Sequence, residues 1–185
     1  VKKMGKKLHR FTPKFLLKYS PGHMRDIRNL GGSRLTTDDL YDINRASSIE
    51  HDLMDNGLSS SLGFSYVANE LNEDKTLDPK YSIELGQIFN YDDNDDLPAK
   101  TSLNRKSSDL VGNTTYYLNK NANLNFNFNL DENYNNLNFA ELTGNFEKNN
   151  FRFNVSYLEE RDYIGSRNSL GTSLDYSFNE RSNIS

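Results

Sequence analysis

Acidic side chains are the first residues in this sequence whose chemistry could bind a ligand. Asp92, Asp93, Asp95 and Asp96 lie within YDDNDDLP and could offer oxygen ligands to a divalent cation. The run lacks the glycine and the terminal glutamate of an EF-hand loop, so it predicts a solvated acidic loop. We therefore predict no metal site here.

The other titratable residues do not have the spacing of a catalytic site. His9, His23 and His51 are scattered along the chain without the spacing of metal ligands. Glu159 and Glu160 are adjacent, so in a strand they would point to opposite faces, which does not suit paired acid–base catalysis. The chain has no cysteine, which excludes a disulfide framework and a thiolate metal site. We predict no enzymatic activity and no cofactor.

The composition narrows the class of protein. The net charge of −4 argues against nucleic acid as a partner, because nucleic-acid-binding domains present a basic surface. Hydrophobic residues make up only 35% of the 185 residues, yet Phe and Tyr reach 12%, and disordered chains are depleted in aromatics. No apolar run approaches the roughly 18 residues of a membrane-spanning helix. The chain is therefore expected to fold, and its aromatic content favours strands.

Strict alternation of apolar and polar residues is the strongest pattern in the chain, and it has the period of a β-strand. In NLNFNFNL every second residue from position 123 is asparagine, and in FRFNVSY the polar residues again alternate with apolar ones. The apolar residues of these two segments are Leu124, Phe126, Phe128, Leu130, Phe151, Phe153, Val155 and Tyr157. Each segment therefore predicts a strand with one apolar and one polar face.

The same alternation recurs along the chain and predicts an all-β fold. We expect eight strands, at 11–20, 58–70, 81–91, 108–119, 123–131, 138–147, 151–160 and 168–179. A possible short strand at 46–50 is left in the long connection at 21–57, and a turn is expected at 71–80. Longer and shorter connections then largely alternate, which is typical of an antiparallel up-and-down meander in an outer-membrane barrel.

Two arrangements of these strands remain open: a transmembrane barrel and a soluble β-sandwich. The barrel is favoured because the polar faces carry Asn, Ser, Thr and Gly more than Lys and Glu, as a wet lumen would. In a barrel the eight apolar residues named above would face lipid. Lys14, Lys18 and Arg152 would then enter the lumen, where they could contact anionic groups. The alternative is that they only hydrate the interior or pair with Glu84 and Glu141.

Four segments together resemble the LptD family of outer-membrane lipopolysaccharide-assembly proteins, also called organic solvent tolerance proteins. They are FTPKFLLKYSPGHMRDI at 11–27, LYDINRASSIE at 40–50, YSIELGQIFNY at 81–91 and LPAKTSLNRKSSDLVG at 97–112. The GQIF and SDLVG pieces are the most specific. The last of these segments is similar to the corresponding segment of alphaproteobacterial-type members.

The resemblance implies lipopolysaccharide transport and insertion into the outer leaflet of a Gram-negative outer membrane. It implies a very large barrel with an LptE-like plug lipoprotein, surrounding outer-membrane lipid, and an LptA-like periplasmic bridge that docks on a jellyroll domain. Residues 1–185 would be a partial barrel domain, truncated at both ends, without the jellyroll and the closing strands. A porin-like channel or receptor barrel and a soluble β-sandwich binding module remain as alternatives.

Overall fold

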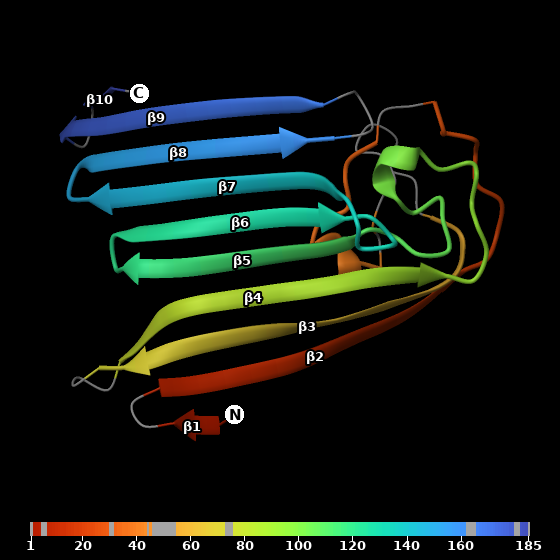
Figure 1. Cartoon of the computed structure of the whole chain (residues 1–185), viewed down its shortest axis with the longest axis horizontal. Coiled ribbons are helices and arrows are strands. Elements are labelled where there is room, and N and C mark those ends of the chain that lie inside the picture. The colour runs from red at the N-terminus through yellow and green to blue at the C-terminus, as the bar shows by residue number, and fades with distance from the viewer. Residues whose placement is uncertain are drawn as a thin grey trace.

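The computed structural model describes residues 2–4, 7–29, 32–43, 45, 55–72, 76–161, 166–179 and 182–184. The described strands form one antiparallel sheet in which each strand pairs with its neighbours in chain order (Figure 1). The predicted all-β meander is therefore confirmed. The possible strand at 46–50 and His51 lie outside the described residues.

The sheet contains ten strands, two of them only three residues long. Their bounds are β1 (Lys2–Met4), β2 (Lys7–Ser20), β3 (Gly57–Leu71), β4 (Leu77–Asn90), β5 (Leu110–Asn119), β6 (Ala122–Leu130), β7 (Leu137–Lys148), β8 (Phe151–Glu160), β9 (Arg167–Asn179) and β10 (Ser182–Ile184). The connections contain two 3-10 turns, η1 (Asp39–Tyr41) and η2 (Ala99–Thr101). No helix in the described part of the chain has the length and apolarity needed to cross a bilayer.

The expected turn at 71–80 is wrong in its extent. The strands β3 and β4 run to Leu71 and from Leu77, so the connection is only 72–76. Proline usually argues against a strand because it has no N–H to donate. Here Pro79 lies inside β4 beside a register shift between Ala68 and Asn69 of β3, and this irregularity accommodates it.

The two ends of the sheet differ in the length of their connections (Figure 1). At one end the strands are joined by 72–76, 120–121 and 149–150, and at the other end by 21–56, 91–109, 131–136 and 161–166. Short turns on one side and long loops on the other are the arrangement of outer-membrane barrels. The alternation expected from the sequence is therefore present, and it is cleaner than expected because of the short 72–76 connection.

One face of the sheet, here termed the apolar face, exposes its large hydrophobic side chains. It includes Phe15, which is 65% exposed, and Phe126, which is 36% exposed and lies opposite Leu142 of β7. The sandwich alternative requires such rows to be buried between two stacked sheets. The described strands belong to a single sheet, so this alternative does not describe the chain.

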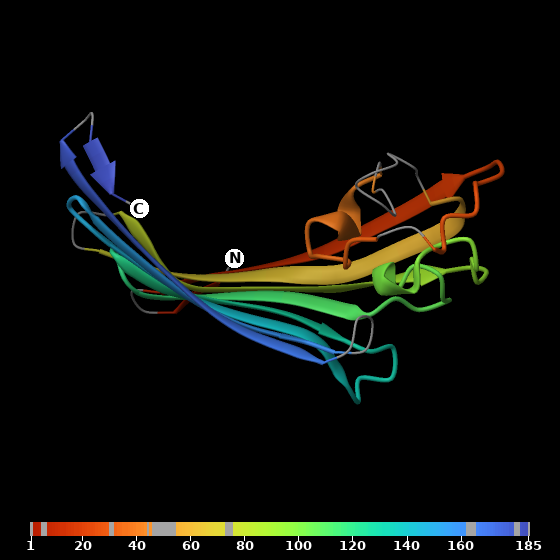
Figure 2. The same ribbon diagram turned by 90° about the horizontal axis from the view of Figure 1, so that it is seen from above.

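The opposite face, termed the polar face, carries the row of Asn123, Asn125, Asn127 and Asn129, and the loops at 21–56 and 91–109 lie over it. Figure 2 shows the loops with η1 and η2 on one side of the curved sheet. Beneath them lies the buried hydrophobic cluster of Ile27, Leu35, Leu40, Ile88, Leu97, Leu103 and Val111. The core of the described chain is therefore a contact between loops and the polar face, at the long-loop end of the sheet.

Candidate functional site

Several asparagines of the polar face are hydrogen-bonded to one another across the strands. Asn113 donates to Asn127 at 2.5 Å, and Asn127 donates to Glu141 at 3.1 Å. A second row runs from Asn154 to Asn145 at 2.7 Å and from Asn145 to Asn123 at 3.1 Å. Cross-strand pairs of this kind contribute about 0.2–1 kcal/mol each. The polar face is therefore a wall of ordered amides.

The loop at 21–56 is fixed to this wall by a buried ion-pair network. Asp55 pairs with Lys18 of β2 through one carboxylate oxygen and with Arg45 through the other, at 3.2 Å. Arg45 also donates to the hydroxyl of Ser59 at 2.8 Å and to that of Ser61 at 3.4 Å, both on β3. The three charged side chains are 1–6% exposed. A buried network that satisfies its charges in this way specifies one position for the loop.

Two glycines make room for the same loop. Gly63 of β3 and Gly86 of β4 are register partners, and Leu40 and Tyr41 of η1 lie against them. A β-carbon on Gly63 would lie 2.2 Å from the carbonyl oxygen of Leu85 and 2.3 Å from the hydroxyl of Tyr41. The close approach of the loop to the sheet thus requires glycine on the wall.

The loop also reaches across the sheet to β8. Arg34 pairs with Glu160 at 3.2 Å and donates to the carbonyl oxygen of Arg161 at 3.1 Å. Lys100, in η2, lies 3.7 Å from the same Glu160 carboxylate. Both long loops therefore meet at the end of β8. Sequence reasoning missed these contacts because no local pattern relates Arg34 or Lys100 to a residue at the end of a strand so distant in the chain.

The loop at 91–109 has its own buried polar centre at Asp109, which is 1% exposed. Its carboxylate accepts from Arg105 at 2.7 Å and from Asn138 at 3.1 Å. Burial raises the pKa of Asp109, and the contacts with Asn138 and Arg105 oppose that rise. Asp109 belongs to the SDLVG piece singled out in the sequence, so a signal for this centre was present.

Gln87 interrupts the apolar face of β4, and the structure explains why it can. It is 4% exposed, donates to the carbonyl oxygen of Ser108 at 2.8 Å and accepts from the Tyr134 hydroxyl at 2.7 Å. Its polar atoms are therefore satisfied within the protein at the long-loop end of the sheet.

The three cations predicted to contact anions each have a carboxylate partner. Lys14 pairs with Glu84, as the sequence analysis allowed, and its amine lies 5.1 Å from the centre of the Tyr41 ring. Lys18 is buried against Asp55, and Arg152 pairs with Glu147 at 3.1 Å on an exposed part of β8. Contact with an anion stays a prediction for all three, and Lys18 is the least accessible of them.

The eight residues predicted to face lipid all lie on β6 and β8. Leu124, Phe126, Phe153 and Tyr157 are 36–42% exposed. The other four, Phe128, Leu130, Phe151 and Val155, are half-buried by neighbouring side chains. Their contact with lipid stays a prediction.

The residues considered for metal or catalytic chemistry are spread over the structure. Asp92, Asp93 and Asp95 are exposed, and Asp96 lies 3.4 Å from Arg28. His9 hydrogen-bonds the Tyr66 hydroxyl at 2.6 Å. Glu159 and Glu160 pair with different arginines. Among the described residues no group of three or more His, Asp or Glu could hold a metal ion.

A single-layer antiparallel meander with an exposed apolar face, a polar face that carries the loops, and long loops at one end only is a wall segment of an outer-membrane β-barrel. A family model described as "LptD: LPS transport system D" matches residues 8–182. The chain therefore belongs to the LptD family, as its sequence motifs predicted. A comparison with curated proteins found no match. At the level of the family, the function is lipopolysaccharide transport and assembly in the Gram-negative outer membrane.

Proposed function

We propose that this chain forms part of the barrel wall past which lipopolysaccharide reaches the outer leaflet of the outer membrane. The observation that supports this most is the family match over residues 8–182. The two faces of the sheet support it as well. The amide-lined polar face suits the sugars of a glycolipid, and the exposed apolar face suits a surrounding bilayer, where a closed barrel satisfies the backbone.

The proposal includes the partners that accompany such a barrel. An LptE-like lipoprotein would fill part of the lumen, and an LptA-like bridge would deliver lipopolysaccharide through a jellyroll domain outside residues 1–185. Arg152 is the most exposed of the three candidate cations, with 68% of its side chain accessible, so it is the one best placed to contact a phosphate.

Depletion of the protein in its source bacterium tests the proposed function. Newly made lipopolysaccharide, pulse-labelled and followed through separated membranes, is expected to stop reaching the outer membrane as the protein is depleted. Re-expression of the protein should restore delivery. Normal delivery together with reduced uptake of small solutes would contradict the proposal and favour the porin-like alternative.

The lipid-facing role of the apolar face is tested by Phe126→Arg. Phe126 lies near the middle of β6, and an arginine near the bilayer midplane is expected to lower the free energy of unfolding by about 2–4 kcal/mol. The measurement is the folded fraction in lipid vesicles, read from the mobility of unheated protein on gels. Asn125→Arg is the matched control, because it puts the same charge on the polar face of the same strand. Equal loss in both variants would refute the assignment of faces.

A further inference from the structure

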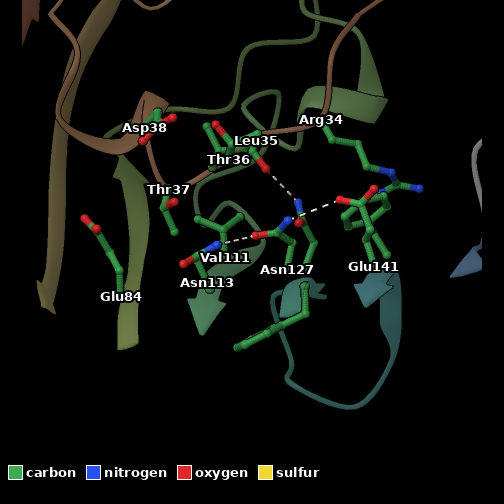
Figure 3. A pocket seen from close by; sticks show the side chains of 14 residues that line it. Arg34, Leu35, Thr36, Thr37, Asp38, Glu84, Val111, Asn113, Asn127 and Glu141 are labelled. Atoms are coloured by element: carbon green, nitrogen blue, oxygen red, sulfur yellow. Dashed lines mark hydrogen bonds between the residues drawn. The ribbon is translucent and has the colours of Figure 1, made fainter. Parts of the chain in front are cut away.

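A cavity of about 480 Å³ lies between the loop segment 34–38 and the polar face of strands β4 to β7 (Figure 3). Its volume falls within the roughly 300–1,000 Å³ of small-molecule sites. The loop forms its roof, and Asn113, Asn127 and Glu141 from three adjacent strands form a hydrogen-bonded row across its floor. The cavity exists only because the loop is held over the wall.

The floor of the cavity offers both donors and acceptors. Asn127 accepts one hydrogen bond from Asn113 and donates one to Glu141, whereas a carboxamide can make up to four. Sugar hydroxyls both donate and accept, so they match amides and carboxylates. Leu35, Val111 and Phe139 add apolar surface to the lining, which suits the C–H faces of a sugar ring.

The charge of the lining argues against an anionic ligand. The lining contains three carboxylates, from Asp38, Glu84 and Glu141, and one guanidinium, from Arg34. Arg34 pairs with Glu160 at 3.2 Å, and Glu84 pairs with Lys14. The carboxylates of Asp38 and Glu141 remain in the lining beside these two ion pairs. The negative charge of a phosphate would therefore be repelled by the excess of carboxylates, whereas an uncharged sugar hydroxyl would not be repelled.

We propose that this cavity is a subsite for a neutral sugar ring, lined by Asn113, Asn127 and Glu141. The subsite rests on the proposed function only for the source of its sugar, the saccharide part of lipopolysaccharide. The subsite would separate the two kinds of polar group in lipopolysaccharide: uncharged sugars bind under the loop, and phosphates stay outside the cavity.

The test is saturation-transfer NMR on the full protein in its native assembly, held in a detergent without sugar headgroups. The probe is a neutral hexose disaccharide, and inorganic phosphate is the competitor. Asn127→Ala is expected to lower the saturation transfer to the disaccharide at least twofold. Asn125→Ala, on the same face of the same strand but outside the cavity and bonded to Thr115, should leave it unchanged. Phosphate should not displace the sugar.

Three results would overturn the subsite: no transfer to the disaccharide, equal transfer in the two variants, or displacement by phosphate. Gel mobility of unheated samples checks that both variants are folded. The depletion experiment measures delivery of lipopolysaccharide in cells, and its result does not depend on whether the disaccharide binds in the cavity. Saturation transfer to the disaccharide in a protein that does not deliver lipopolysaccharide would support the subsite and contradict the proposed function. Delivery of lipopolysaccharide without saturation transfer would support the proposed function and contradict the subsite.

Discussion

Asp55→Ala is expected to release the loop at 21–56 from the wall and to cost about 3–5 kcal/mol, because it leaves two buried cations without their carboxylate. Lys18 and Arg45 are 6% and 1% exposed in their side chains, so neither is solvated in place of the lost partner. The loop must move to hydrate them. The same movement would open the cavity beneath segment 34–38.

Trypsin added to intact cells measures this release. Arg25 and Arg28 are exposed in both states, whereas Arg45 is 2% exposed and becomes cleavable only when the loop leaves the wall. We expect cleavage after Arg45 in Asp55→Ala and not in the wild type. Glu147→Ala is the matched control, since it removes the partner of the exposed Arg152 and should change nothing measurable. Protection of Arg45 in Asp55→Ala would show that the network does not hold the loop.

Gly63→Ala is expected to impair assembly of the wall, at a cost of about 1–3 kcal/mol for forcing atoms into a filled space. The added β-carbon would lie 2.2 Å from the carbonyl oxygen of Leu85, which is backbone and cannot rotate away. It would also lie 2.3 Å from the Tyr41 hydroxyl. The folded fraction in vesicles, measured against denaturant, should fall accordingly.

Gly171→Ala is the control for this substitution. Gly171 is also a strand glycine, but the nearest atom to its added β-carbon is the Ser156 hydroxyl at 3.1 Å, which can rotate. Combining Gly63→Ala with Tyr41→Ala separates the two clashes. Because the backbone clash with Leu85 remains, the double variant should stay impaired. Full recovery would mean that the loop alone sets the requirement for glycine.

The strands and their faces could be predicted from the sequence because alternation is a local property. The pattern at 123–130 depends only on the pleat of one strand, and the structure keeps it in β6. The three-residue strands β1 and β10 were missed because three polar-rich residues carry no period. The start of β4 was predicted too late because Pro79 is a turn signal in the sequence. The register shift in β3 that lets Pro79 lie within the strand cannot be seen from the sequence.

The contacts of the long loops could not be predicted in the same way. Ile88 and Val111 place apolar side chains on the polar face, where the alternation predicts polar residues. The exception is explained only by the loop residues that cover them in the folded chain. The pairing of Lys14 with Glu84 was foreseen because both lie on strands with an assigned face. The partners of Lys18 and Arg34 were not, since no local pattern positions residues 55 and 160 beside them.

The contact between Arg34 and Glu160 has a mechanical consequence for the rim of the wall. Six inter-strand spacings separate β2 from β8, which corresponds to roughly 29 Å along the sheet. The loop that leaves β2 crosses that arc, and its Arg34 forms a nearly buried ion pair with Glu160 at the end of β8. The same loop is held near β2 by the pairing of Asp55 with Lys18 and Arg45. Flattening the arc would move these two anchor points apart, so the ion pair opposes dilation of this rim from within the chain itself.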